Sequence, residues 1–129
     1  MTLDDVQRWL DDYVEAWRTY DPKKIAALFS GDATYAYHPW DEPVRGREAI
    51  VADWLTDRDA PNSWEGTYQP SLIDGDRAIA TGVTRYTSGK VYSNLWLLRF
   101  NQNGECNEFV EWYMLQPGFP RDEEAPNSP

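Results

Sequence analysis

Apolar residues recur every three or four positions in three segments within the first half of the chain. This spacing is typical of helices that bury one face. The first segment opens with Thr2, which can cap a helix, and the second opens with Asp21 and Pro22, a pair typical of a helix N-terminus. We therefore predict helices over residues 2–19, from Pro22 to just before Gly31, and, after Gly46, over residues 47–56.

Long runs rich in β-branched and aromatic residues follow the third predicted helix. The first three of these runs end at turns that contain glycine, and successive hairpin turns predict an antiparallel meander. A shorter strand is predicted over 33–37, before a loop over 38–45 that holds two prolines. The long strands are predicted over residues 63–73, 77–87, 91–100 and 106–116.

Helices followed by strands are the order of an α+β domain in which the helices pack on one face of an antiparallel sheet. The chain has 129 residues, enough for one such domain, and we place it at residues 1–116. Residues 117–129 are rich in proline, lack any periodicity and carry an acidic cluster at 122–124, so we expect a flexible tail there.

The last two predicted strands are apolar on both of their faces. A sheet covered by helices on one side normally turns a polar face to water on the other, so a second apolar face needs a cover. We expect that cover to be a second copy of the chain. The residues expected in this homodimer interface are Leu95, Leu97, Val110 and Trp112.

The charge balance narrows the classes of partner. Twelve basic against 22 acidic residues give a formal net charge of −10, which disfavours nucleic acids and anionic membrane surfaces. A single cysteine, Cys106, and a single histidine, His38, cannot build a zinc site together, and no glycine-rich nucleotide loop is present. No secretory leader or membrane-spanning run is recognisable, so we expect a cytoplasmic protein that needs neither a metal nor a cofactor.

Several short motifs give the chain a family resemblance. They are Asp21-Pro22, Ala27-Leu28-Phe29, Asp32-Ala33-Thr34, and Arg45-Gly46-Arg47-Glu48-Ala49-Ile50 followed by Trp54. With these motifs, residues 3–116 resemble the nuclear transport factor 2-like superfamily, specifically its SnoaL-like branch. The resemblance implies a cone-shaped cystatin-like roll, in which a bent antiparallel sheet wraps three N-terminal helices around a deep pocket, often in a homodimer. It does not select one activity, because the superfamily includes cyclases, isomerases, dehydratases, epoxide hydrolases and proteins that only bind or scaffold.

Comparison with two enzyme types of this superfamily argues against their mechanisms. The ketosteroid isomerases use a helix tyrosine and two acids; the corresponding positions here resemble Tyr13, then Tyr37 or His38, and Trp96. Only the tyrosine is retained. The epoxide hydrolases need an Asp-Arg-Asp relay, and no Arg-x-Asp pair occurs on a predicted strand.

Three residues are candidates for acid–base chemistry. In the register that the resemblance implies for the last strand, Glu111 points into the pocket, where burial favours its protonated form. The alternatives are a carboxylate that is hydrogen-bonded to a tyrosine, or a solvated residue like Glu108. His38 can exchange protons near pH 7 at the pocket mouth, and Tyr13 can donate its hydroxyl to an oxyanion; a loop histidine bonded to backbone and a core tyrosine are the structural alternatives.

Aromatic residues make up 15% of the chain, and they suit both a core and the wall of a ligand pocket. We expect a pocket for a small hydrophobic molecule and cofactor-independent acid–base catalysis of the cyclase, isomerase or dehydratase type. A non-catalytic binding module and a dimeric scaffold are the alternatives. The residues expected to line the pocket are Trp17, Tyr37, Trp54, Asn94, Trp96, Phe109 and Tyr113.

Overall fold

The computed structural model describes residues 1–118, so the predicted tail lies, apart from its first two residues, outside the described residues. Three helices form where the apolar spacing predicts them: α1 (Leu3–Thr19), α2 (Pro22–Leu28) and α3 (Arg47–Thr56). Thr2 caps α1, because its hydroxyl accepts from the Asp5 N–H while the Asp5 carboxylate accepts from the Thr2 N–H. The Asp21 side chain caps α2.

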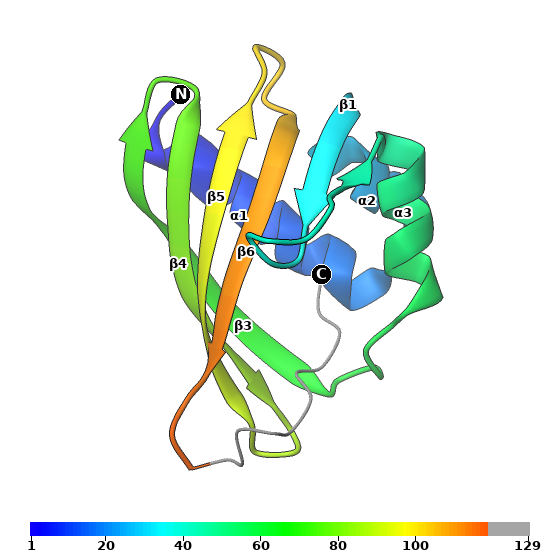
Figure 1. Ribbon diagram of the computed structural model, residues 1–129, viewed down its shortest axis with the longest axis vertical. Coiled ribbons are helices and arrows are strands. Elements are labelled where there is room, and N and C mark those ends of the chain that lie inside the picture. Colours follow the sequence, from blue (N-terminus) through cyan, green and yellow to red (C-terminus); the bar gives the residue numbers. More distant parts are fainter. Residues whose placement is uncertain (119–129) are drawn as a thin grey trace.

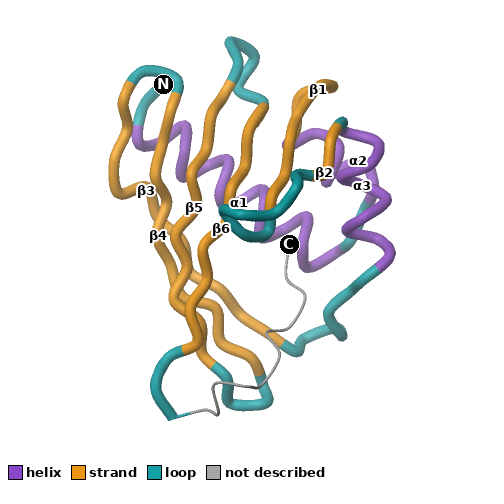
Figure 2. The backbone as a smooth tube through the Cα atoms, viewed as in Figure 1, coloured by secondary structure: helices purple, strands orange, loops and turns teal. Residues whose placement is uncertain are grey.

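Six strands form one open, mixed sheet in the order β2-β1-β6-β5-β4-β3. Their bounds are β1 Phe29–Ala36, β2 Val44–Arg45, β3 Trp64–Asp74, β4 Arg77–Tyr86, β5 Val91–Phe100 and β6 Cys106–Leu115. The predicted meander is confirmed for β3 to β6, which pair antiparallel through three hairpins. Figure 2 shows these hairpins and the long bent strands that they join.

The β1 end of the sheet differs from the prediction in three ways. The strand starts at Phe29, directly after α2, rather than at residue 33. It pairs parallel with β6, although the sequence predicts an antiparallel sheet. The predicted loop at 38–45 contributes the short strand β2, which pairs antiparallel with β1. These pairings join segments without a hairpin turn of their own or lie in a proline-rich loop, so no turn motif signals them.

The helices lie against one face of the sheet and at its β1 edge, which gives an α+β, cone-like fold (Figure 1). Helix α1 contacts β3 and α2, and α3 packs against β1 and α2. The buried face of α1 consists of Val6, Trp9, Leu10, Tyr13, Ala16 and Trp17. Within residues 1–118 no helix is both long and apolar enough to cross a membrane.

The Arg-Gly motif that carries the family resemblance fastens α3 to the sheet. Gly46 has a φ of 93°, which favours glycine, and its N–H donates to the Ala33 carbonyl oxygen at 2.7 Å. Arg47 donates to the Phe29 carbonyl oxygen at 2.9 Å and forms an ion pair with Glu105 at 3.1 Å. The motif therefore joins the start of α3 to β1 and to the hairpin before β6, which is a role in the fold rather than in chemistry.

The alternation of burial along β5 and β6 follows the sequence pattern. Residues 92, 94, 96, 98 and 100 of β5 are buried, and so are Phe109 and Glu111 of β6. The opposite face carries Leu97, which is 37% exposed. Cross-strand pairing extends this outer apolar face beyond the predicted residues, because one row runs across four strands through Leu72, Ile79, Leu97 and Val110.

Candidate functional site

The carboxyl group of Glu111 lies among the aromatic rings of the core. Its exposed fraction is 0%. The ring of Phe109, on the same face of β6, stacks on Tyr35 at 4.2 Å and on Tyr13 at 5.5 Å between ring centroids. Trp96 of β5 lies 5.1 Å from Phe109 and 4.7 Å from Tyr13. The sheet and α1 thus surround one ionisable group with apolar surface.

The two oxygens of Glu111 have different surroundings. Oε2 accepts hydrogen bonds from the indole Nε1 of Trp96 at 2.8 Å and from the amide Nδ2 of Asn94 at 3.1 Å. Oε1 is buried and has no hydrogen-bond partner among residues 1–118. Burial raises the pKa of Glu111 to about 8, and the two N–H donors partly oppose that rise. Near neutral pH the group is therefore largely protonated. Its Oε2 is hydrogen-bonded, and its Oε1 has no hydrogen-bond partner among residues 1–118.

A pair of tyrosine hydroxyls lies in the same cluster. The hydroxyls of Tyr13 and Tyr35 are 2.6 Å apart. Burial raises the pKa of Tyr13 well above its usual range, and negative charge on Glu111 raises it further. Burial does the same to Tyr35. Both groups therefore remain phenols, which donate hydrogen bonds rather than carry charge.

Two polar contacts are made just after the end of β1, one with α3 and one within the loop that follows. Tyr37 donates to Asp53 of α3 through a short hydrogen bond. His38 Nδ1 lies 2.7 Å from Asp41 Oδ2, and the His38 ring lies 5.0 Å from that of Tyr113. Asp41 therefore orients the His38 ring.

The structure brings most of the predicted site residues together around Glu111. Asn94 and Trp96 bind its carboxyl group, and Trp54 lies edge-on to Tyr13 at 5.1 Å. Trp17, Trp54, Trp96 and Phe109 are at most 1% exposed, so they are core side chains, whereas Tyr37 and Tyr113 are partly exposed. Their role in binding a ligand stays a prediction.

Sequence reasoning missed Asp59, which lies in the loop after α3. Its carboxylate accepts from the Trp17 indole at 3.0 Å, and its N–H donates to the Tyr20 hydroxyl at 2.8 Å. Burial raises the pKa of Asp59 to about 6. The local sequence over residues 57–63 is polar and typical of a loop, so it carries no signal that this acid is partly enclosed.

Tyr68 and Thr84 were also missed. Both are buried, and their hydroxyls are joined by a short hydrogen bond. Thr84 donates to Asn94 Oδ1 at 2.9 Å, and this links both hydroxyls to the side-chain amide that donates to Glu111. Tyrosine and threonine are common strand residues, so their types alone do not single them out.

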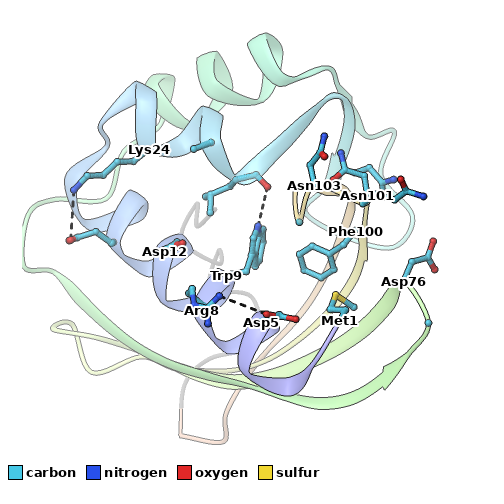
Figure 3. Close-up of a pocket in the computed structure, with 17 residues that line it drawn as sticks. Met1, Asp5, Arg8, Trp9, Asp12, Lys24, Asp76, Phe100, Asn101 and Asn103 are labelled. Carbon is cyan, nitrogen blue, oxygen red and sulfur yellow. Dashed lines mark hydrogen bonds and ion pairs between the residues drawn. The ribbon is translucent and has the colours of Figure 1, made fainter.

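A separate pocket of about 1210 Å³ lies beside the N-terminal half of α1, at the β3–β4 and β5–β6 turns (Figure 3). Trp9 and Phe100 lie side by side at its centre, with ring centroids 5.4 Å apart. On its rim Arg8 faces Asp5 and Lys24 faces Glu15, at 3.7 and 3.9 Å. Its lining contains none of the predicted site residues.

The described residues offer no obvious place for a metal ion or a reactive thiol. Within residues 1–118, no three histidine, cysteine or acidic side chains gather closely enough to hold a metal ion. Cys106 is buried, and burial raises the pKa of its thiol to about 12. The chemistry of the cluster around Glu111 therefore depends on carboxyl, phenol, amide and indole groups.

Comparison with known proteins agrees with this architecture. A family model described as a SnoaL-like domain matches residues 10–114. A protein of unknown function from Burkholderia xenovorans LB400, described as NTF-2 like, has 17% identity and a TM-score of 0.70, covering 92% of this chain and 89% of its own. A proposed ketosteroid isomerase from Kribbella flavida DSM 17836 has 16% identity and a TM-score of 0.67, covering 98% and 92%. At such identities these structures show a shared fold alone.

Proposed function

Since the chain belongs to the SnoaL-like domain family and encloses the Glu111 carboxyl group in its aromatic core, we propose that it binds a small, flat, largely apolar molecule and transfers a proton to or from it. The observation that carries the proposal is the asymmetry of Glu111. Oε2 is held by two N–H donors, while the buried Oε1 has no hydrogen-bond partner within residues 1–118.

The proposed reaction is proton transfer at a carbon next to a carbonyl group. Ionised Glu111 removes the C–H proton through Oε1, and the electron pair moves onto the carbonyl oxygen. The phenols of Tyr13 and Tyr35 stay protonated and are bonded to each other, so one of them donates to the other and the second has a proton left to donate to that oxygen. Protonated Glu111 then returns the proton to another atom of the same molecule, which completes an isomerisation, or assists the departure of water in a dehydration. No cofactor is needed for these steps.

His38 has a secondary role in the proposal. Asp41 holds Nδ1 of its ring, which leaves Nε2 to exchange a proton with the reacting molecule or with water. Tyr113 links this pair to β6, the strand that carries Glu111.

A probe reaction tests Glu111 without knowledge of the natural substrate. 5-Nitrobenzisoxazole is a flat, apolar compound; when a base removes its ring C–H proton, the N–O bond breaks and a coloured phenolate forms. We expect wild-type turnover to increase as pH rises through about 8, because the base is the ionised form of Glu111. Glu111→Gln should lower the rate by about 100-fold or more.

The matched control is Glu108→Gln, which alters an exposed acid on the same strand and should keep wild-type turnover. Wild-type turnover in Glu111→Gln would contradict the assignment of Glu111 as the base.

A binding module without turnover is the second candidate, favoured by the flat ring surfaces that surround Glu111. In that case 2-naphthol should bind with a change in its fluorescence and raise the melting temperature. 5-Nitrobenzisoxazole would then be consumed no faster with protein than without it.

A further inference from the structure

A continuous chain of hydrogen bonds crosses the inner face of the sheet and ends on Glu111. It starts at the hydroxyl of Tyr68 on β3, which is bonded to Thr84 Oγ1 on β4. Thr84 Oγ1 donates to Asn94 Oδ1 on β5 at 2.9 Å. Asn94 Nδ2 donates to Glu111 Oε2 on β6 at 3.1 Å. Each of four neighbouring strands supplies one member, and all four side chains are buried.

The direction of this chain follows from the number of protons available. A threonine hydroxyl has one proton, and that of Thr84 is donated to Asn94. Tyr68 must therefore be the donor in its bond to Thr84. With its carbonyl oxygen occupied by Thr84, the Asn94 amide turns its NH₂ group toward Glu111, which is the orientation that an ionised carboxylate requires.

The backbone is shaped to hold the Tyr68 ring in this position. A Cβ atom placed on Gly66 or on Gly82 would collide with that ring, so both positions need glycine. On its other side the ring stacks on Trp96, with centroids 4.4 Å apart. Glycine weakens a strand interior and is typical of places where another group approaches the backbone closely. Here the group that approaches is Tyr68.

We propose that Tyr68 is a positioning residue for Glu111: its hydroxyl, acting through Thr84, fixes the Asn94 amide so that an N–H donor stays on the Glu111 carboxylate. The catalytic consequence of this proposal rests on the proposed function, but the effect on Glu111 itself does not.

In the opposite chain direction, Thr84 accepts from a reversed Asn94 amide and Tyr68 has to accept from Thr84. A phenol is a better donor than acceptor, so the Tyr68 hydroxyl disfavours this direction, and its removal ends that preference. A reversed amide presents its carbonyl oxygen to Glu111, which repels a carboxylate and accepts a hydrogen bond from a protonated carboxyl group. The tyrosine hydroxyl therefore favours the ionised form of a residue that it does not touch.

The test is the titration of Glu111 in protein labelled with ¹³C at the glutamate carboxyl carbons, followed by NMR. Tyr68→Phe keeps the ring packed against Gly66 and Gly82 and removes only the hydroxyl. The pH at which half of Glu111 is ionised should rise by about one pH unit, the effect of weakening one hydrogen bond to a charged group.

Three further variants distinguish an effect of this hydrogen-bond chain on the Glu111 titration from general effects of mutation. Thr84→Val should cause the same rise, because valine has nearly the shape of threonine without its hydroxyl, whereas Thr84→Ser should titrate like the wild type. Tyr20→Phe removes a tyrosine hydroxyl outside the chain and should leave the titration unchanged. A Tyr68→Phe titration equal to that of the wild type would overturn the proposal, as would an equal rise in Tyr20→Phe.

The two proposals fail in different ways. If the wild type does not convert 5-nitrobenzisoxazole, the catalytic proposal fails while the NMR titration still decides the role of Tyr68. If the wild type does convert it, the rise of turnover with pH should move upward in Tyr68→Phe by the same amount as the titration.

Discussion

Glu111 occupies surroundings that oppose its ionisation. Burial raises its pKa from the ordinary value of 4.5 to about 8. In the unfolded chain the group loses its proton above about pH 4.5, whereas in the folded protein it keeps the proton until about pH 8. The folded state therefore binds more protons across this window, and its free energy of unfolding must fall as pH rises.

Glu111→Gln should remove this loss of stability. Glutamine does not ionise, and its amide oxygen can still accept from Trp96 and Asn94. We expect the variant and the wild type to have similar free energies of unfolding near pH 4.5. At pH 8.5 the variant should be more stable by about 2–5 kcal/mol. Urea unfolding at both pH values measures this, and a difference that does not change with pH would contradict the raised pKa.

Such a result would also show that the carboxyl group of Glu111 is not needed for folding. A carboxyl group that lowers stability at neutral pH is not explained by packing, because an amide of the same shape would serve the core better. Glu111→Gln would lose turnover and yet be the more stable protein, which is the pattern expected of a residue whose role is catalytic rather than structural.

At the scale of elements, the β3–β4 hairpin is adapted to one side chain. Gly66 and Gly82 lie beneath the Tyr68 ring, and Thr84 meets its hydroxyl. The alternation of residues along a strand places Tyr68 on the inner face together with Trp64, whose ring stacks on Trp17 of α1 at 3.5 Å. The hairpin thus contributes rings to the contact with α1 and a hydroxyl to the carboxyl group on β6.

Gly82→Ala should disturb this arrangement. The added methyl group would meet the Thr67 carbonyl oxygen and the Tyr68 ring, so the hairpin would have to shift. We expect a loss of about 1–3 kcal/mol in the free energy of unfolding.

Gly31→Ala is the control for this prediction, since a Cβ on that β1 glycine meets no atom within 4 Å. Its free energy of unfolding should stay within about 0.5 kcal/mol of the wild type. Equal losses in the two variants would show that the Tyr68 ring does not require the glycine.

At the scale of the whole molecule, the sheet has two apolar faces with different neighbours. The inner face is covered by the helices, as Figure 1 shows. The outer face carries the row Leu72, Ile79, Leu97 and Val110, next to Leu95 and Trp112. Leu72 is 57% exposed and Leu97 37% exposed. An exposed apolar band across four strands is typical of an interface rather than of a solvated surface.

We expect the chain to form a homodimer through this outer face. A stable interface buries about 800 Å² on each partner, and the four-strand band offers a broad apolar centre for it. Sedimentation velocity should show a dimer at micromolar concentration, and Leu97→Glu should convert it to a monomer.

Leu3→Glu, at an exposed leucine on α1, should remain dimeric and serves as the control. A monomeric wild type would contradict the predicted interface.

Local patterns in the sequence predict much of the fold, because helices and hairpins depend on neighbours in the chain. The capped, periodic segment at 2–19 becomes α1, and the glycine turns between residues 73 and 106 become hairpins in the predicted order. Alternation along the last strand also turns Glu111 inward. The parallel pairing of β1 with β6 carries no such signal, because it joins distant segments without a turn.

The candidate site depends more heavily on three-dimensional packing. Alternation tells which strand residues share a face, and the family resemblance adds which face of the last strand points inward. Neither tells how deeply Glu111, Asn94 and Trp96 are buried or which atoms meet. The partners of Glu111, the short bond from Tyr68 to Thr84 and the enclosure of Asp59 arise from strand register and from the closure of α1 over the sheet. Hydrogen bonding and burial depend on distances between remote segments, and those distances exist only in the folded chain.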